Sequence, residues 1–220
     1  MKNQNVKMVL SLTLIAAISA FLLNMVVMIT KPRIEKNKAE YLQQAILEIL
    51  PESKRIVAYG KEKDRFIIVG QDDPKPFFHA VFDAQGNLIA VLLQAQGQGY
   101  QELVKILFAY DPTSEQLLGI KVLESKETPG LGDRILTDKV FLKSFQKLAM
   151  PLEITGEVLI HSLELTRRGK PKEAWQIDGI TGATISSRAV VRILTQGGNR
   201  FFPLLKRYPL PLDKDLSINN

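Results

Sequence analysis

The sequence lacks cysteine entirely and has only two histidines, His79 and His161, among its 220 residues. Without cysteine there can be no disulfide, no thiolate metal site, no cysteine-ligated iron–sulfur cluster and no lipid-anchored cysteine. Two histidines are too few for a histidine-rich metal site, and we therefore expect no bound metal. If the protein handles electrons, an organic cofactor must carry them.

Signatures of nucleotide and nucleic-acid binding are also missing. The sequence has no G-x-G-x-x-G, no P-loop and no internal repeat. Its formal net charge is +6, but the basic residues are spread along the chain, so no nucleic-acid partner is expected. The positive charge could face anionic lipid or an acidic partner, or serve only solubility. A basic run could likewise dock an acidic group, although a solvated loop accounts for it equally; its members are Arg167, Arg168, Lys170 and Lys172.

One long hydrophobic run lies near the N-terminus, from Met8 to Ile29. About 20 apolar residues, each rising 1.5 Å along a helix, cross a hydrocarbon core of roughly 30 Å. A cleaved signal peptide would have a shorter apolar core and small residues near its end, whereas this run ends in V-V-M-I-T-K-P. We therefore predict an uncleaved transmembrane anchor over residues 1–30. Flanking charges leave its orientation open, because long domains are translocated largely regardless of them.

The rest of the chain predicts an α+β domain. Apolar residues at helical spacing predict a linker helix over residues 31–51, which Pro51 would end. Runs rich in β-branched and aromatic residues predict about five mostly antiparallel strands, and we expect a helix from Val140 to Leu148 after them. The strands are expected at residues 66–69, 77–82, 88–93, 103–110 and 117–123. We expect the domain to cover residues 52–200 and a loose C-terminal tail to cover residues 201–220.

Two glycine-bearing loops interrupt the strands. G-Q-G-Y, at residues 97–100, is weak by itself because a bulge or turn accounts for it. E-S-K-E-T-P-G-L-G-D, at residues 124–133, is more informative, because its Pro-Gly pair enforces a turn. Leu131 stands alone between two glycines, where it could cover a flat ring, while Glu127 and Thr128 supply hydrogen-bonding groups. A tight turn with a buried leucine is the other interpretation.

A third glycine loop, D-G-I-T-G-A-T, runs into a helix that we expect to begin near Thr184. One apolar face of this helix is expected to contain Ile185, Ala189, Val190, Ile193 and Leu194. The glycines permit close approach of a ligand, and the free N–H groups and dipole at a helix start suit a phosphate. Alternatively, Thr181 or Thr184 simply caps the helix.

Together the three loops resemble one known family. G-Q-G-Y, V-L-E-S-K-E-T-P-G-L-G and D-G-I-T-G-A-T-I-S-S-R-A-V, in this order behind one apolar span, are similar to the G subunit, the FMN-binding one, of the Rnf (Rsx) electron-transport complex. The C subunit of the sodium-pumping NADH:quinone reductase is a sister with similar motifs. The resemblance extends over nearly the whole chain, and the pairing of E-T-P-G-L-G with T-G-A-T is its most specific part.

The resemblance implies a covalent FMN. In that family the last threonine of [ST]-G-A-T carries FMN through a phosphoester bond, which a separate flavin transferase makes from FAD, so Thr184 is the implied attachment residue. It also implies a complex of several subunits that couples ferredoxin–NAD electron transfer to cation transport. The flavin domain would lie on the periplasmic or outer face of the cytoplasmic membrane, with no catalytic acid or base of its own. The implied FMN contacts are Thr181, Gly182, Ala183 and Thr184, with Glu127, Thr128, Gly130 and Leu131.

One departure and three alternatives accompany this resemblance. Family members often have histidine where this chain has Ser125, and serine cannot titrate near neutral pH as histidine can. The C subunit of the sodium-pumping reductase is an alternative, although we expect it to be longer between the anchor and the first glycine loop. A non-redox membrane-anchored scaffold would not need an intact T-G-A-T. A sensor that binds FMN loosely would not need a hydroxyl at position 184.

Overall fold

The computed structural model describes residues 2–70, 76–170, 173–208 and 210. The chain divides into two compact units, residues 1–44 and residues 45–220. Helix α1 (Lys2–Ile49) forms the first unit, and its last residues belong to the second. Lys172 of the basic run lies outside the described residues.

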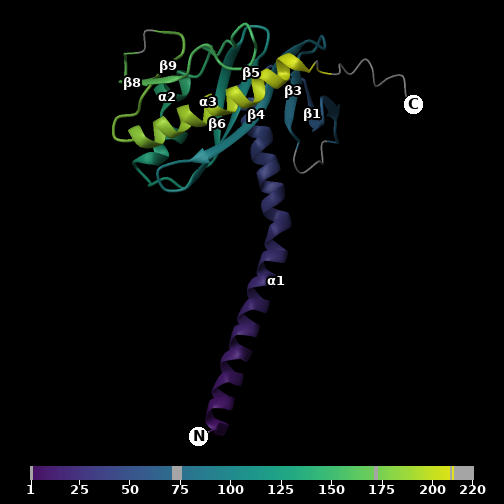
Figure 1. Ribbon diagram of the computed structural model, residues 1–220, viewed down its shortest axis with the longest axis vertical. Coiled ribbons are helices and arrows are strands. Elements are labelled where there is room, and N and C mark those ends of the chain that lie inside the picture. Colours follow the sequence, from purple (N-terminus) through teal and green to yellow (C-terminus); the bar gives the residue numbers. More distant parts are fainter. Residues whose placement is uncertain (1, 71–75, 171–172, 209, 211–220) are drawn as a thin grey trace, which may run out of the picture. The chain divides into compact units, whose positions relative to one another are not determined.

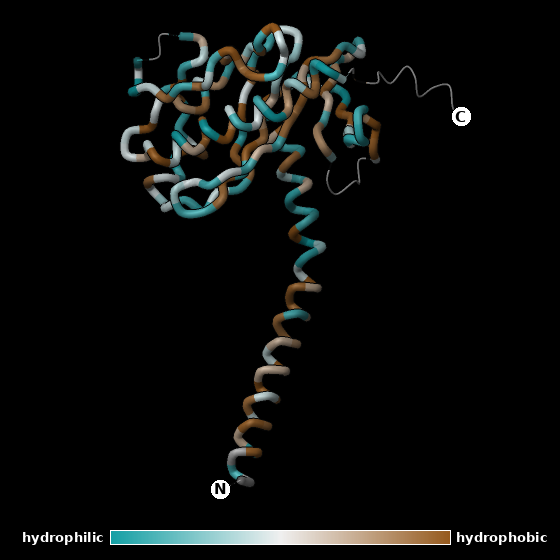
Figure 2. Tube along the Cα trace, viewed as in Figure 1, coloured by the Kyte–Doolittle hydropathy of each residue, from teal (hydrophilic) through white to brown (hydrophobic). Residues whose placement is uncertain are grey.

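Helix α1 contains the stretch expected to cross the membrane. Its large apolar side chains from Met8 to Ile29 are exposed to solvent, and Figure 2 shows this stretch as mostly hydrophobic. Within the described residues, α1 is the one helix long and apolar enough to cross a membrane. Pro32 lies inside it, so the expected anchor and the expected linker form one continuous helix.

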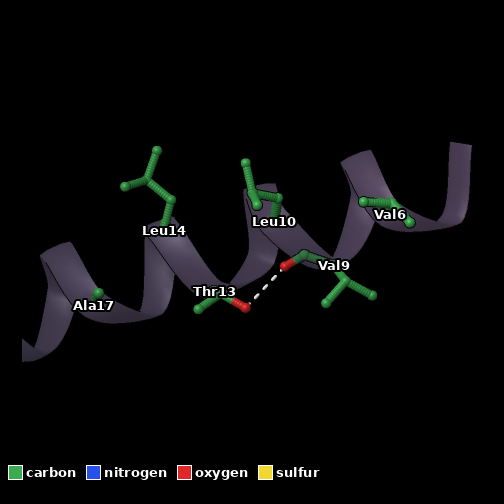
Figure 3. A pocket seen from close by; sticks show the side chains of 6 residues that line it. All are labelled: Val6, Val9, Leu10, Thr13, Leu14 and Ala17. Atoms are coloured by element: carbon green, nitrogen blue, oxygen red, sulfur yellow. Dashed lines mark hydrogen bonds between the residues drawn. The ribbon is translucent and has the colours of Figure 1, made fainter. Parts of the chain in front are cut away.

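A hollow on the surface of α1 belongs to this apolar stretch rather than to a ligand site. Figure 3 shows the residues that line it, all of which come from α1 itself: Val6, Val9, Leu10, Thr13, Leu14 and Ala17. Such a surface suits lipid acyl chains, because nothing but apolar side chains and one threonine faces it. The Thr13 hydroxyl is already satisfied, since it donates to the Val9 carbonyl at 2.9 Å.

The second unit is built on a seven-stranded sheet with the order β2-β1-β3-β4-β5-β6-β7 (Figure 1). Its strands are β1 (Arg55–Glu62), β2 (Arg65–Ile68), β3 (Phe78–Phe82), β4 (Leu88–Gln98), β5 (Leu103–Asp111), β6 (Gln116–Glu124) and β7 (Leu148–Ala149). Every pairing in this sheet is antiparallel. A separate parallel pair joins β8 (Glu164–Thr166) to β9 (Gln176–Asp178). The expected mostly antiparallel sheet with flanking helices is thus confirmed.

Some expected elements differ in extent. The predicted helix from Val140 to Leu148 is too long, because α2 covers only Lys139–Lys143 and Leu148 instead pairs with Leu117 in the sheet. Strand β4 extends to Gln98 and so absorbs the start of the G-Q-G-Y loop. Strand β1 has no counterpart among the predictions, because Val57, Ala58 and Tyr59 are all buried and its pattern does not alternate.

The two faces of the sheet are covered differently. Helix α3 (Thr184–Arg207) packs on one face so closely that a Cβ at Gly97 would lie 2.7 Å from Ile193 Cγ1. The last turn of α1 lies on the opposite face. There Ile49 Cγ2 would lie 3.1 Å from a Cβ at Gly119, and Glu48 pairs with Lys121 on the same strand.

Helix α3 continues past residue 200, where we expected the C-terminal tail to begin. Phe201 and Phe202 on this part of the helix are buried. Phe202 stacks on Tyr110 with ring centroids 3.6 Å apart, and Phe201 meets Phe77 edge-on at 5.3 Å. These residues therefore belong to the core, and the helix ends only at Arg207.

Candidate functional site

The three glycine-bearing loops meet at one buried carboxylate, that of Glu127. Oxygen Oε1 accepts hydrogen bonds from the backbone N–H groups of Tyr100, at 2.8 Å, and Gln101, at 3.2 Å. Oxygen Oε2 accepts from the hydroxyl of Ser186 on α3, at 2.5 Å. Only 5% of Glu127 is exposed, so these bonds are shielded from water. Glu127 therefore ties all three loops together.

The glycines on both sides of this carboxylate leave it the space it needs. A Cβ at Gly99 would lie 2.3 Å from Glu127 Oε1, and a Cβ at Gly132 would lie 2.6 Å from both Glu127 Oε2 and Ser186 Oγ. Real Cβ atoms do not approach other atoms so closely, so any larger residue would displace the carboxylate. This explains why glycines occur in loops that are far apart in the sequence.

The second loop presents its leucine outward. The Thr128 hydroxyl accepts a hydrogen bond from the Gln101 side chain at 2.8 Å, and the Leu131 N–H donates to the Thr128 carbonyl at 3.2 Å. Gly130 is exposed and has φ +76, and Leu131 is 54% exposed. The alternative of a buried leucine in a tight turn is therefore wrong. Ser125 accepts a hydrogen bond from the Glu127 N–H at 3.3 Å.

The third loop leads into a helix whose first turn has no side-chain cap. Helix α3 begins at Thr184, and its N-cap is Ala183, which makes no side-chain cap hydrogen bond. The alternative that Thr181 or Thr184 caps the helix is therefore wrong. Thr181, Gly182 and Thr184 are exposed, whereas Ala183 is buried. The Thr184 hydroxyl thus lies at an accessible helix start.

Several polar groups near these loops have no partner in the part of the chain that the structure describes. No hydrogen bond is found for the backbone N–H groups of Gly182, Thr184, Ile185 and Ser186. A helix start leaves such groups free, and with the helix dipole they favour an anion. One oxygen of Asp133, Oδ1, is buried without a hydrogen-bond partner, which is rare for a buried polar atom. Nothing in the local sequence pattern marks Asp133 out.

The apolar face of α3 is nearly as expected. Ala189, Val190, Ile193 and Leu194 are buried, but Ile185 is 56% exposed. Ile185 lies in the first turn and points away from the buried side, where Ser186 and Ser187 are, so its inclusion in the apolar face is wrong. Tyr100 on the first loop, Leu131 on the second and Ile185 in the first turn of α3 are all exposed.

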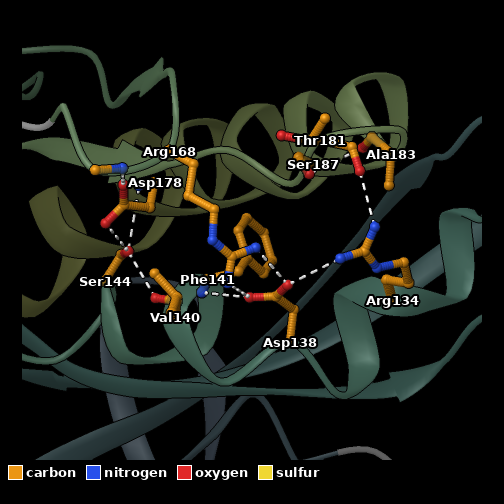
Figure 4. A network of polar contacts seen from close by, with 11 residues as sticks. Arg134, Asp138, Val140, Phe141, Ser144, Arg168, Asp178, Thr181, Ala183 and Ser187 are labelled. Carbon is orange, nitrogen blue, oxygen red and sulfur yellow. Dashed lines mark hydrogen bonds and ion pairs between the residues drawn. The ribbon is translucent and has the colours of Figure 1, made fainter.

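Figure 4 shows a polar network that reaches the third loop. Arg134, in the 3-10 helix η1 (Gly132–Leu136), donates to the Thr181 carbonyl at 2.8 Å. Asp138 lies between Arg134 and Arg168. Asp178 accepts hydrogen bonds from the Gly169 N–H and the Ser144 hydroxyl, which fixes the strand that leads into the loop. The sequence patterns do not indicate these long-range pairs.

Residues 99–197 match the family model described as FMN-binding domain, and this range includes nearly all of the three loops. The chain is 31% identical over 203 residues to the G subunit of the ion-translocating oxidoreductase complex of Cronobacter sakazakii, with 86% of each chain covered. It is 29% identical over 191 residues to the protein of the same name from Methanosarcina acetivorans, covering 86% of this chain and 89% of that one.

Solved structures agree on the fold. The crystal structure of NqrC from Shewanella oneidensis superposes with a TM-score of 0.61 over 78% of this chain and 98% of that one, at 20% sequence identity. An identity this low supports the fold alone. The sequence relatives are matched over most of their length and by more than the loop motifs. The chain belongs to the family formed by the G subunits of ion-translocating oxidoreductase complexes.

Proposed function

We propose that this chain is the membrane-anchored electron-transfer subunit of an ion-translocating oxidoreductase complex, and that it carries FMN in a phosphoester bond to Thr184. The observation that carries the proposal is the position of Thr184. Its side chain is exposed at the first residue of α3, beside N–H groups that have no partner in the described structure. The surrounding residues 99–197 match an FMN-binding domain.

The residues at this site fit FMN. The free N–H groups at the start of α3 suit its phosphate, and the small Gly182 and Ala183 leave room for the chain attached to it. The unpaired Asp133 Oδ1 can accept from a ribityl hydroxyl, because a buried acceptor favours a donor. The exposed side chain of Leu131 offers an apolar surface to a flat ring.

Each group of residues would have a distinct task. Thr184 holds the cofactor, Thr181 and Gly182 flank its phosphate, and Thr128, Gly130 and Leu131 lie toward the ring. Glu127 has its oxygens occupied by Tyr100, Gln101 and Ser186, so we assign it the role of holding the loops rather than a direct flavin contact. Bound FMN would accept and pass on electrons, a reaction that the residues of this chain cannot perform.

The cellular setting is part of the same proposal. We propose that α1 anchors the protein in the cytoplasmic membrane, that residues 52–200 bind FMN outside it, and that other members of a complex coupling ferredoxin–NAD chemistry to cation transport supply and remove the electrons. The C subunit of the sodium-translocating NADH:quinone reductase is the alternative. It is supported only by fold, at 20% and 18% identity, whereas the sequence relatives named above are G subunits.

The attachment is tested by coexpressing the chain with a flavin transferase that uses FAD. The denatured wild-type protein should fluoresce as a band on a gel, and the band should be absent in Thr184→Ala. Thr184→Ser keeps a hydroxyl and should be labelled, and Thr181→Ala should still be labelled because the bond is assigned to the other hydroxyl. Mass spectrometry of the tryptic peptide Glu173–Arg188 should locate the added mass on Thr184.

Two outcomes would decide against the proposal. A fluorescent band that persists in Thr184→Ala would place the bond on another residue. A wild-type chain that remains unlabelled by an active transferase would favour a non-redox scaffold, or a sensor that binds FMN loosely.

A further inference from the structure

One arginine fixes the carbonyl of the loop that precedes Thr184. Arg134 Nη1 donates to the Thr181 carbonyl oxygen at 2.8 Å, and Figure 4 shows its guanidinium extending from η1 toward the third loop. Its second nitrogen, Nη2, lies 3.4 Å from Asp138 Oδ2. The guanidinium therefore joins the loop to an acidic anchor.

That anchor, Asp138, is held by several hydrogen bonds. The Asp138 side chain is only 7% exposed and caps α2, where it accepts from the Phe141 N–H at 3.0 Å. Arg168 donates to both of its oxygens, at 2.8 and 3.1 Å. Bidentate charge-assisted pairs of this kind are strong and directional. Arg168, from the basic run that could have been a solvated loop, is thus committed to this network.

The hydrogen bond from Arg134 to the Thr181 carbonyl also determines the direction of the Gly182 N–H. The described peptide bonds are all trans, and in a trans peptide the C=O and the N–H point in opposite directions. With the Thr181 carbonyl turned toward Arg134, the Gly182 N–H points away from Arg134. Gly182 has φ +84, and the Ala183 N–H closes a turn on the Ile180 carbonyl at 3.0 Å. Gly182 N–H therefore remains free, like the first N–H groups of α3.

We propose that Arg134 is a positioning residue for flavin attachment: by holding the Thr181 carbonyl, it presents the Gly182 N–H and the Thr184 hydroxyl in one fixed arrangement to the incoming phosphate. We assign Arg134 a role through the loop, because the contacts that its two terminal nitrogens make are with Thr181 and Asp138. Since attachment to Thr184 is itself proposed above, this role depends on that function.

The step that Arg134 supports is a phosphoryl transfer without oxidation or reduction. The Thr184 oxygen forms a bond to the phosphorus next to the ribityl chain of a flavin adenine dinucleotide. The anhydride bond to the other phosphate breaks, AMP leaves with the electron pair, and the hydroxyl proton passes to a base of the transferase or to water. Backbone N–H groups held in place stabilise the charge on the phosphate, and positioned donors of this kind change rates by large factors.

The test is a time course of flavin transfer onto the full-length chain in detergent, with the acceptor concentration varied to separate kcat from KM. Arg134→Ala should lower kcat by about 10- to 100-fold with KM for the acceptor unchanged, as expected for one lost hydrogen bond from a charged group. Arg134→Lys keeps one donor and the charge, and should lie closer to wild type than to Arg134→Ala. Arg167→Ala is the matched control from the adjacent basic run and should transfer at the wild-type rate.

Several results would overturn the role of Arg134. A wild-type kcat in Arg134→Ala would do so, and so would a raised KM alone, which would mean that Arg134 contacts the transferase. An equal loss of kcat in Arg167→Ala would mean that the positive charge of this surface matters and not the hydrogen bond from Arg134. If Arg134→Ala fails to fold, Asp138→Asn takes its place. This variant weakens the anchor of Arg134 and should lower kcat by about 3- to 10-fold. A wild-type kcat in Asp138→Asn would also overturn the role. A wild-type chain that is never labelled with flavin would instead contradict the proposed function itself.

Discussion

At the scale of single residues, Glu127 connects parts of the chain that no local pattern relates. Its three partners lie 27, 26 and 59 residues away in the sequence. Because the carboxylate is buried, removing it leaves donors without water or protein to replace it, at about 1–3 kcal/mol for each unsatisfied group. The G-Q-G-Y loop and the start of α3 should therefore loosen together when Glu127 is lost.

Glu127→Ala should lower the free energy of unfolding by about 2–4 kcal/mol, since one substitution leaves up to three donors unpaired. Glu127→Gln should lower it by less than about 1 kcal/mol. Its amide oxygen can still accept from Tyr100 and Gln101, and the Ser186 hydroxyl can turn from donor to acceptor. Urea unfolding of the full chain in detergent measures both variants. Equal losses in the two would show that the hydrogen bonds are not the cause.

Asp138 should make the stability of the site sensitive to acid. The hydrogen bonds from Arg168 hold the pKa of Asp138 below its usual value, with smaller lowering contributions from the Phe141 N–H and from the charges of Arg168 and Arg134. A depressed folded-state pKa stabilises the folded protein above the unfolded value of about 3.9, and this contribution is lost as pH falls through the folded pKa. The free energy of unfolding should therefore fall below about pH 4.

The matched variant for this pH dependence is Asp138→Asn, which has no carboxylate to protonate. It should be less stable than wild type at neutral pH and should lose less stability on acidification. Urea unfolding from about pH 3 to about pH 7 would compare the two curves. Parallel curves would mean that other carboxylates cause the acid sensitivity.

Much of the site could be predicted from residue types that affect the backbone near their own position. Glycine, proline and threonine restrict the backbone or offer a hydroxyl wherever they occur, so the three loops could be recognised before the fold was known. Contacts between distant residues could not, because nothing near Glu127 indicates Ser186 and nothing near Arg134 indicates Thr181. Asp138 has a partial signal, since aspartate before K-V-F suits a helix N-cap, but its pairing with Arg168 exists only in the folded chain.

At the scale of elements, the sequence predicts the strands that alternate or are strongly apolar. It does not predict the strands that are defined only by their pairing with a neighbouring strand. The three-residue strands β8 and β9 are too short for any periodicity, and they exist because residues 164–166 and 176–178 pair in parallel. Helix α2 ends at Lys143, and Leu148, which we expected in the helix, pairs with Leu117 in the sheet. The end of α1 is the clearest case: its last turn is part of the domain that follows.

This assignment of α1 can be tested by two truncations. Ala45, Ile46 and Leu50 are buried within the second unit, so a chain that starts at residue 40 keeps these contacts and should be soluble and folded. A chain that starts at residue 51 loses them, including two large side chains. Its free energy of unfolding should be lower by about 3–6 kcal/mol. Thermal unfolding followed by circular dichroism compares the two, and equal melting temperatures would show that the last turn of α1 contributes nothing.

At the scale of the whole molecule, an apolar helix followed by an FMN-binding domain raises the question of which side of the membrane the domain faces. Flanking charges do not decide this. The proposed covalent bond to FMN would suit the outer side, because cofactor that dissociated there could not readily be replaced from the cytoplasm. The absence of cysteine is compatible with either side, and it provides a chain with no background for thiol labelling.

Single cysteines introduced on either side of α1 should therefore report the orientation. Ser162 is exposed in the second unit, and Gln4 is exposed at the start of α1. In intact spheroplasts, a membrane-impermeant maleimide should label Ser162→Cys at once, whereas Gln4→Cys should be labelled only after lysis. The reverse pattern would place the flavin domain in the cytoplasm. Labelling of both without lysis would mean that α1 does not span the membrane, because a spanning helix keeps its two ends in separate compartments.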